Sequence, residues 1–271
     1  MNIDFDAMGE YFNKSSRTLR RWEKERPEKF NIMLEEYLRE SASTNNNENK
    51  GCIIGAFSIK GGVGKSTICD ALGSFLDESV ILNLDIGQRA SEINACPTID
   101  YSDIMNSGKT IEMILNELSL KYRYIIVDTP GEITEEVVAV IPFIKHFIIP
   151  MTIGKRSRYG IESTIEGFFN NEDLSIDGNI KVMFLINAYK NLKKRDAAIV
   201  HFKTMYSQFK PANDIKLISK LSALDYSDAI SSAEEAGESI VTLAQQNPGA
   251  YTKAMRKINA VCRTIEQHFE L

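Results

Sequence analysis

The chain has 271 residues, of which 43% are hydrophobic and 25% are charged, and this composition excludes a disordered, collagen-like or disulfide-stapled protein. Its formal net charge of −5 excludes a uniformly basic protein but leaves room for local basic patches. The four cysteines contain no CxxC pair, which supports neither a metal site nor a disulfide. The sequence has no run of 18 apolar residues, and its first twenty residues include six charged side chains. We therefore expect a cytoplasmic protein that neither spans a membrane nor is exported.

Residues 1–40 are predicted to form a small all-α module. A tight turn at 13–15 and Pro27 separate three expected helices, which cover residues 6–12, 16–25 and 28–39. Between positions 11 and 30 there are seven basic and three acidic residues, a local charge of +4 in an acidic protein. Two short helices joined by a tight turn, the second rich in arginine, resemble a helix-turn-helix of the MerR-like or partition-repressor kind.

The second helix of this module has the side chains that we expect to contact DNA. Leu19 and Trp22 would face the core of the module, which leaves four polar side chains for phosphates and base edges: Ser15, Arg17, Arg20 and Arg21. The same pattern also fits a solvated helix that mediates dimerisation, and the sequence leaves both interpretations open.

Residues 41–50, SASTNNNENK, have no large apolar side chain and are predicted to link this module to a larger domain at 51–271. In that domain continuous apolar runs occur at 52–59, 79–85, 124–128, 146–151, 182–187 and, more weakly, 216–218. They alternate with helical stretches at 66–76, 111–120, 135–144, 161–170 and 195–209. Continuous apolar runs are typical of strands covered on both faces. We therefore predict an α/β domain with a mostly parallel sheet flanked by helices, in which ligands bind at the carboxyl ends of the strands.

The sequence KGGVGKST at residues 60–67 directly follows the first apolar run and precedes a helical stretch. Its glycines let successive N–H groups point at phosphate oxygens, Lys65 supplies a positive charge, and Ser66 offers a hydroxyl to Mg²⁺. The positive end of the following helix points to the same phosphates. We therefore predict a phosphate-binding loop formed by Lys60, Gly61, Gly62, Val63, Gly64, Lys65, Ser66 and Thr67.

This loop departs from the common G-x-x-x-x-G-K-[ST] pattern, because Ile59 stands at the first glycine position and an additional lysine, Lys60, begins the loop. It resembles the deviant Walker A motif, KGGxGK[ST], of the ParA and MinD superfamily of P-loop ATPases. The resemblance implies an ATPase that uses ATP and Mg²⁺ and forms an ATP-sandwich homodimer, in which Lys60 reaches the nucleotide of the partner. The alternative is that Lys60 is an ordinary solvated lysine.

Two further segments resemble the same superfamily in the same order. In LNLDIGQRAS, residues 82–91, Asp85 falls on the second aspartate of the switch I motif D-x-D-P-Q, although Asn83 replaces the first aspartate and Gly87 the proline. In YIIVDTPG, residues 124–131, Asp128 falls on the Walker B aspartate, although an aspartate there also suits a helix cap. The resemblance implies that the catalytic residues are Lys60, Lys65 and Asp85, with Asp85 orienting the attacking water, and that the metal is held by Ser66, Asp85 and Asp128.

Asn187 ends the apolar run at 182–187, where an amide could read the edge of the purine. An asparagine that closes a strand is also a common turn residue, and the sequence does not choose between the two roles.

The N-terminal module favours the larger ParA-type partition proteins, which repress their own operon. The resemblance implies a dimer that binds DNA nonspecifically on the nucleoid and a ParB-like centromere-binding partner that stimulates hydrolysis. Basic clusters at 154–160 and 189–196 are candidates for the nonspecific contacts. One alternative is a sequence-specific transcription regulator with an ATP switch.

A second alternative is a MinD-like ATPase on a membrane, which would require a lipid-binding helix at the C-terminal end. The apolar stripe of the tail consists of Met255, Ile258, Cys262, Ile265 and Phe269. Because its middle lacks a bulky aromatic anchor, we expect it to dock on the sheet, and a membrane partner is not expected.

Overall fold

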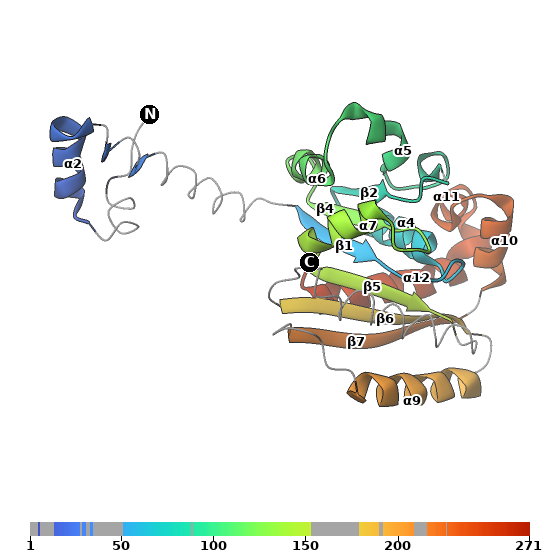
Figure 1. Cartoon of the computed structure of the whole chain (residues 1–271). Helices are drawn as coiled ribbons and strands as arrows, with labels where there is room; N and C mark the ends of the chain where they lie inside the picture. The colour runs from blue at the N-terminus through green and yellow to red at the C-terminus, as the bar shows by residue number, and fades with distance from the viewer. Residues whose placement is uncertain are drawn as a thin grey trace. The chain divides into compact units, whose positions relative to one another are not determined.

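A computed structural model of the chain describes residues 5, 14–27, 29–30, 33–34, 51–87, 89–152, 179–189, 192–208, 216–225 and 227–271. The chain divides into two compact units, Met1–Lys50 and Gly51–Leu271, and each is considered by itself (Figure 1). Several predicted segments lie outside the described residues, namely the helices at 6–12 and 161–170, most of the helix at 28–39, the linker at 41–50 and the basic cluster at 154–160.

The first unit contains α2 (Ser16–Glu25), which has the bounds predicted from the sequence. The hydroxyl of Ser15 accepts a hydrogen bond from the Thr18 N–H at 3.2 Å, so this candidate DNA contact also caps the helix. Leu19 is fully buried beside Phe30, and Trp22 packs against this pair, as its predicted core position requires.

The three arginines of α2 that the sequence assigns to DNA are exposed. The guanidinium of Arg20 lies 4.9 Å from the centroid of the Phe5 ring, and Arg21 lies 3.7 Å from a carboxylate oxygen of Glu25. Contacts of this kind at a surface contribute little free energy. The face of α2 formed by Arg17, Arg20 and Arg21 therefore remains basic and accessible to an anionic partner.

The second unit is built on a seven-stranded sheet in which every described strand pairs in parallel, whereas the sequence predicted a mostly parallel sheet (Figure 1). Its strands are β1 (Cys52–Ala56), β2 (Ser79–Asn83), β3 (Thr98–Asp100), β4 (Tyr124–Asp128), β5 (His146–Met151), β6 (Asn179–Tyr189) and β7 (Lys216–Asp225). Their order in the sheet is β3-β2-β4-β1-β5-β6-β7, which places β1 in the centre.

The strand ends differ from the prediction for identifiable reasons. The predicted strands 52–59 and 79–85 end at Ala56 and Asn83, because the apolar runs continue into buried loop residues such as Phe57 and Leu84. In contrast, β6 and β7 extend beyond the apolar runs predicted at 182–187 and 216–218. Polar residues are interspersed with apolar residues along β7, which lies at one edge of the sheet. The short strand β3 has no apolar run and was not predicted.

Helices cover both faces of the sheet (Figure 1). One face packs against α6 (Ile111–Ser119), α7 (Glu135–Val140) and α9 (Leu192–Gln208), and the other against α4 (Lys65–Phe75), α10 (Asp228–Ala236), α11 (Ile240–Gln246) and α12 (Pro248–Phe269). The short helix α5 (Tyr101–Ile104) and three 3₁₀ turns, η1 (Ala90–Glu92), η2 (Met105–Ser107) and η3 (Ile141–Phe143), complete the described helices. The predicted helix at 135–144 is therefore shorter, since Pro142 falls in the 3₁₀ turn that follows α7.

The predicted apolar stripe of the tail lies on α12 and is docked as expected. Ile258, Cys262, Ile265 and Phe269 are buried in the core formed with α4 and the sheet, and Met255 packs against the same core. Within the described ranges, no helix combines the length and apolar character needed to cross a bilayer.

Candidate nucleotide-binding site

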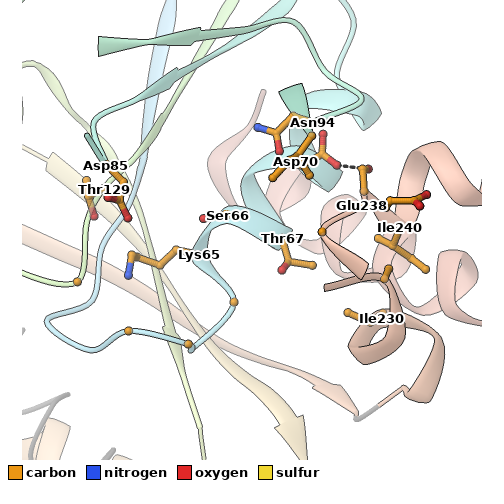
Figure 2. A pocket seen from close by; sticks show the side chains of 18 residues that line it. Lys65, Ser66, Thr67, Asp70, Asp85, Asn94, Thr129, Ile230, Glu238 and Ile240 are labelled. Atoms are coloured by element: carbon orange, nitrogen blue, oxygen red, sulfur yellow. Dashed lines mark hydrogen bonds between the residues drawn. The ribbon is translucent and has the colours of Figure 1, made fainter. Parts of the chain in front are cut away.

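The predicted phosphate loop connects the carboxyl end of β1 to the first turn of α4 (Figure 2). Gly62 and Gly64 have φ angles of 66° and 89°, a left-handed conformation that glycine adopts without strain. Gly64 directly precedes α4, and its carbonyl accepts the N–H of Ile68 at 3.1 Å. Because the first turn of a helix has N–H groups without intrahelical partners, this arrangement provides donors and a positive dipole end for an anion.

Asn187 supports the phosphate loop from β6. Its side-chain nitrogen donates to the carbonyl of Val63 at 2.9 Å, and a β-carbon added to Gly64 would lie 2.0 Å from the same nitrogen. The Asn187 amide therefore fixes the backbone of the loop. Its predicted contact with the purine stays a prediction.

The register of three adjacent strands brings the other predicted residues to this loop. Ala56 at the end of β1 is paired with Asp128 at the end of β4, and Asp128 is paired with Asn83 at the end of β2. Asp85 follows two residues after Asn83, and Thr129 donates to the carbonyl of Ala56 at 2.7 Å. Because parallel strands end at the same edge, three motifs that lie far apart in sequence converge on one site.

Lys65 and Asp128 form the buried charged centre of the site. Lys65 is 8% exposed, and its ammonium donates to the Lys60 carbonyl at 3.4 Å. Burial lowers the pKa of Lys65, and the negative charge of Asp128 partly opposes this effect. Asp128 is 2% exposed, and burial raises its pKa to about 6, although a hydrogen bond with Ser66 and the charge of Lys65 oppose the rise.

Asp85 lies in the segment that resembles switch I, and a hydrogen-bond network around Asn83 holds this segment. The Asn83 oxygen accepts the Asp85 N–H at 3.0 Å, and the Asn83 nitrogen donates to Asp100 of β3 at 2.7 Å. Asp100 also accepts the N–H groups of Ala90 and Ser91. Burial alone would raise the pKa of Asp100, but these hydrogen bonds lower it, so the carboxylate stays ionised and orders the segment after Asp85.

A cavity of about 350 Å³ opens beside the loop (Figure 2). Six of the predicted phosphate-binding residues line it: Gly61, Gly62, Gly64, Lys65, Ser66 and Thr67. Asp85 and Thr129 line the same end, whereas the predicted residues Lys60, Val63, Asn187 and Asp128 are not part of the lining. The Lys60 ammonium donates instead to the Thr152 hydroxyl at 3.4 Å.

The other end of the cavity contains residues that the sequence analysis did not identify. Figure 2 shows Asp70, Asn94, Glu238 and Ile240 on the opposite side of Thr67 from Lys65. Of these residues, Asp70 had a visible signal in the sequence, because it is an acidic residue among the apolar residues of the predicted helix at 66–76. The others come from loops and helix ends whose proximity to α4 depends on the tertiary fold.

Comparison of the sequence with family profiles and with curated proteins gives no significant match. Solved structures do match. An ATP complex of a single-residue variant of Cyanothece McdA has a TM-score of 0.57 at 16% identity, over 82% of this chain and 98% of that chain.

Two further structures match to a similar extent. The ParA of pNOB8 has a TM-score of 0.54 at 12% identity over 81% of this chain and 99% of that chain. The cell division protein MinD of Aquifex aeolicus has a TM-score of 0.51 at 19% identity over 80% of this chain and 97% of that chain. With its parallel sheet, central phosphate loop and flanking helices, the second unit of this chain has the P-loop fold of the ParA, MinD and McdA ATPases.

Proposed function

We propose that this protein is a ParA-type partition ATPase that hydrolyses ATP to ADP and phosphate. The observation that carries the proposal is the convergence of Lys65, Ser66 and Asp85 on one cavity at the carboxyl ends of adjacent strands, with the buried Asp128 carboxyl group interacting with Ser66 and Lys65. The ATP complex of the similar McdA structure supports the choice of nucleotide. Phosphoryl transfer to water needs positioning and charge stabilisation rather than a nucleophilic side chain, and these residues supply both.

Each residue has a separate task in this proposal. The first turn of α4 and the Lys65 ammonium bind the phosphates, and Lys65 offsets the negative charge that grows on the transferred phosphoryl group. The half-buried Asp85 carboxylate orients the attacking water. It is held for this task by the N–H of Gly87, which donates to its Oδ1 at 3.1 Å.

The site also fits Mg²⁺. The Oδ1 atom of Asp128 is buried and has no hydrogen-bond partner among the described residues, while its carboxyl group interacts with Ser66. A carboxylate with a free oxygen beside a hydroxyl suits Mg²⁺, which usually takes one or two protein ligands in addition to phosphates and water. Ser66 and Asp128 would hold the ion, with Asp85 near its water shell, and the bound ion would supply charge stabilisation to the phosphates.

We further propose that ATP joins two copies of the chain with Lys60 acting on the partner's nucleotide. Lys60 begins the phosphate loop but is outside the cavity of its own chain. Ile86 and Ile133 follow the carboxyl ends of β2 and β4, and they are 48% and 44% exposed. A second copy facing this edge would cover both apolar side chains.

The first unit supports the proposed DNA binding. Arg17, Arg20 and Arg21 form the exposed basic face of α2, which suits base edges and phosphates. The proposed cycle runs from the ATP dimer on nucleoid DNA, through hydrolysis stimulated by a ParB-like centromere-binding protein, to a detached monomer.

The basic face of α2 also favours the second candidate, a transcription regulator in which ATP is a switch. The burial of the α12 stripe weighs against a MinD-like membrane role.

The experiment that tests this function measures ATP hydrolysis and oligomeric state together. With ATP and Mg²⁺, light scattering should detect a dimer of the full chain. Lys60→Ala should leave the monomer folded and abolish this dimer, because its charge acts on the partner. A chain that neither binds nor hydrolyses ATP would overturn the ATPase proposal. If Lys60→Ala forms the same dimer and hydrolyses ATP at the normal rate, Lys60 is an ordinary solvated lysine.

A further inference from the structure

One carboxylate joins three segments around the far end of the nucleotide cavity. Asp70 lies on α4, 3% exposed, and its Oδ1 accepts the N–H groups of Ala95 at 2.7 Å and Cys96 at 3.1 Å. Its Oδ2 accepts the hydroxyl hydrogen of Ser239, the bond drawn dashed in Figure 2. Ser239 in turn accepts the N–H of Val241 at 3.1 Å and caps α11.

The segments that Asp70 joins form two walls of the cavity that meet at its carboxylate. Ile93 and Asn94 directly precede the Ala95 N–H that Asp70 accepts, and they line one wall. Glu238 and Ile240 flank Ser239 and line the other wall, together with Ile230 of α10. The position of each wall relative to the phosphate loop thus depends on a side chain of α4, the helix that begins at Lys65.

The chemistry of this far end differs from that of the loop end. Isoleucine side chains provide apolar surface, and the Asn94 amide and Glu238 carboxylate provide hydrogen-bonding groups without positive charge. Two acidic residues, Asp70 and Glu238, repel phosphate, whereas a neutral ring with hydrogen-bonding edges would be accepted. The far end therefore suits a sugar and base, while the loop end suits phosphates.

We propose that Asp70 is a positioning residue for the nucleoside of ATP, which fixes the two walls that hold the sugar and base without contributing to phosphate binding. This inference rests on the proposed function, that the cavity binds ATP. Without the Asp70 carboxylate, the N–H groups of Ala95 and Cys96 and the hydroxyl of Ser239 would lose their acceptor, and both walls would shift to find new partners.

The test compares ATP with inorganic tripolyphosphate, which has the phosphates but no nucleoside. Dissociation constants of both probes with Mg²⁺ are measured by calorimetry on the full chain. Asp70→Ala should weaken ATP binding about tenfold or more, the effect of a lost buried hydrogen bond to a charged group, while tripolyphosphate binding stays unchanged. Asp70→Asn, whose amide oxygen can still accept from Ala95 and Cys96, should give an intermediate loss for ATP.

Two additional variants keep the test decisive. Ser239→Ala removes one of the three bonds but keeps Asp70, so it should shift the ratio of the two affinities in the same direction even if Asp70→Ala does not fold. Ser79→Ala is the matched control, because Ser79 is buried, donates to the Gly73 carbonyl of α4 at 2.5 Å and lies 3.4 Å from the Cys96 sulfur, but is outside the cavity. It should leave the ratio unchanged.

Each result separates the inference from the proposed function. Wild-type protein that binds neither probe overturns the proposed function itself. If the wild type binds ATP but the Asp70 and Ser239 variants lose both probes equally, or lose neither, then Asp70 does not position the nucleoside and the inference fails. Wild-type protein that binds tripolyphosphate as tightly as ATP overturns the inference as well, since the nucleoside then contributes nothing to binding.

Discussion

At the scale of single residues, Lys65 and Asp85 reach the same end of the cavity but serve different stages of the proposed reaction. Lys65→Ala should abolish detectable ATP binding, because it removes the buried charge that faces the phosphates. Asp85→Ala should retain ATP and slow hydrolysis on the order of 10²-fold, since it removes only the group that orients water. Binding by calorimetry and single-turnover hydrolysis measure the two effects. Equal loss of ATP binding in both variants would contradict this division of roles.

Asp128 makes the stability of the nucleotide-free protein depend on pH. Its folded-state pKa of about 6 is above the usual 3.8, so folding favours the neutral acid and the free energy of unfolding falls as pH rises from about 4 to about 6. Asp128→Asn stays neutral and avoids this loss. It should be more stable than the wild type by up to about 3 kcal/mol above pH 7, and the gap should close near pH 4.

Urea denaturation of both proteins across this pH range, without nucleotide or metal, measures the gap. Asp77→Asn is the control for the loss of one negative charge, because the Asp77 carboxylate is exposed and does not line the cavity. A constant difference between Asp128→Asn and the wild type from pH 4 to pH 8 would show that the buried group does not titrate as described.

The site residues differ in how far the sequence could identify them. The loop at 60–67 was predicted because it follows an apolar run and its residue types suit phosphate binding, and Asp85 and Asp128 were predicted because they fall on the switch I and Walker B motifs that the sequence resembles. Asp100 and Ser239 escaped prediction, since their roles arise only when β3 lies beside β2 and α11 approaches α4. Such partners are set by tertiary packing, and no local pattern encodes them.

At the scale of elements, α12 is a structural helix of the second unit. Ile258→Ala should lower the free energy of unfolding by about 2–5 kcal/mol, because it leaves a cavity between α12 and α4. Arg256→Ala, a change at an exposed position on the same helix, should alter it by less than about 0.5 kcal/mol. Chemical denaturation provides both values.

A membrane role for α12 would give a different result. Sedimentation with anionic liposomes should show no increase in binding when ATP is added. ATP-dependent sedimentation that disappears on removing residues 255–271, in a truncated protein that remains folded, would contradict the docked role and favour the MinD-like alternative.

The type of most elements was predictable, but their ends were not. Central strands such as β4 and β5 match the predicted ranges, because burial on both faces produces an uninterrupted apolar run. The lengths of β1 and β2 were overestimated, since Phe57 and Leu84 follow these strands but are buried in the same hydrophobic core. An apolar run indicates burial, and burial here continues past the last strand residue.

At the scale of the whole molecule, the two units should bind DNA in different ways. Removing residues 1–48 should abolish discrimination between the protein's own upstream DNA and random DNA and leave ATP hydrolysis measurable. Arg20→Ala with Arg21→Ala in the full chain should reproduce the loss of discrimination, because each good base contact contributes about 1–3 kcal/mol. Nonspecific binding should require ATP, since a dimer doubles the phosphate contacts and steepens the salt dependence.

Competition binding at fixed salt measures this discrimination. Glu23→Ala, at an exposed position of the same helix, is the matched control and should keep it. If the truncated and full chains discriminate equally, or the full chain never discriminates, α2 serves dimerisation or partner binding instead.

The docking of α12 also makes the molecule convenient to handle. The ring centroid of Phe269 lies 4.8 Å from that of His146 at the start of β5, and Lys181 near the start of β6 donates to the Phe269 carbonyl at 3.2 Å. The last residues of the chain therefore lie at the amino ends of the strands, across the full length of the sheet from the nucleotide cavity (Figure 1). A surface tether or fluorescent label attached at Leu271 would lie at the opposite end of the strands from the nucleotide cavity, so that nucleotide exchange could be followed on single immobilised molecules.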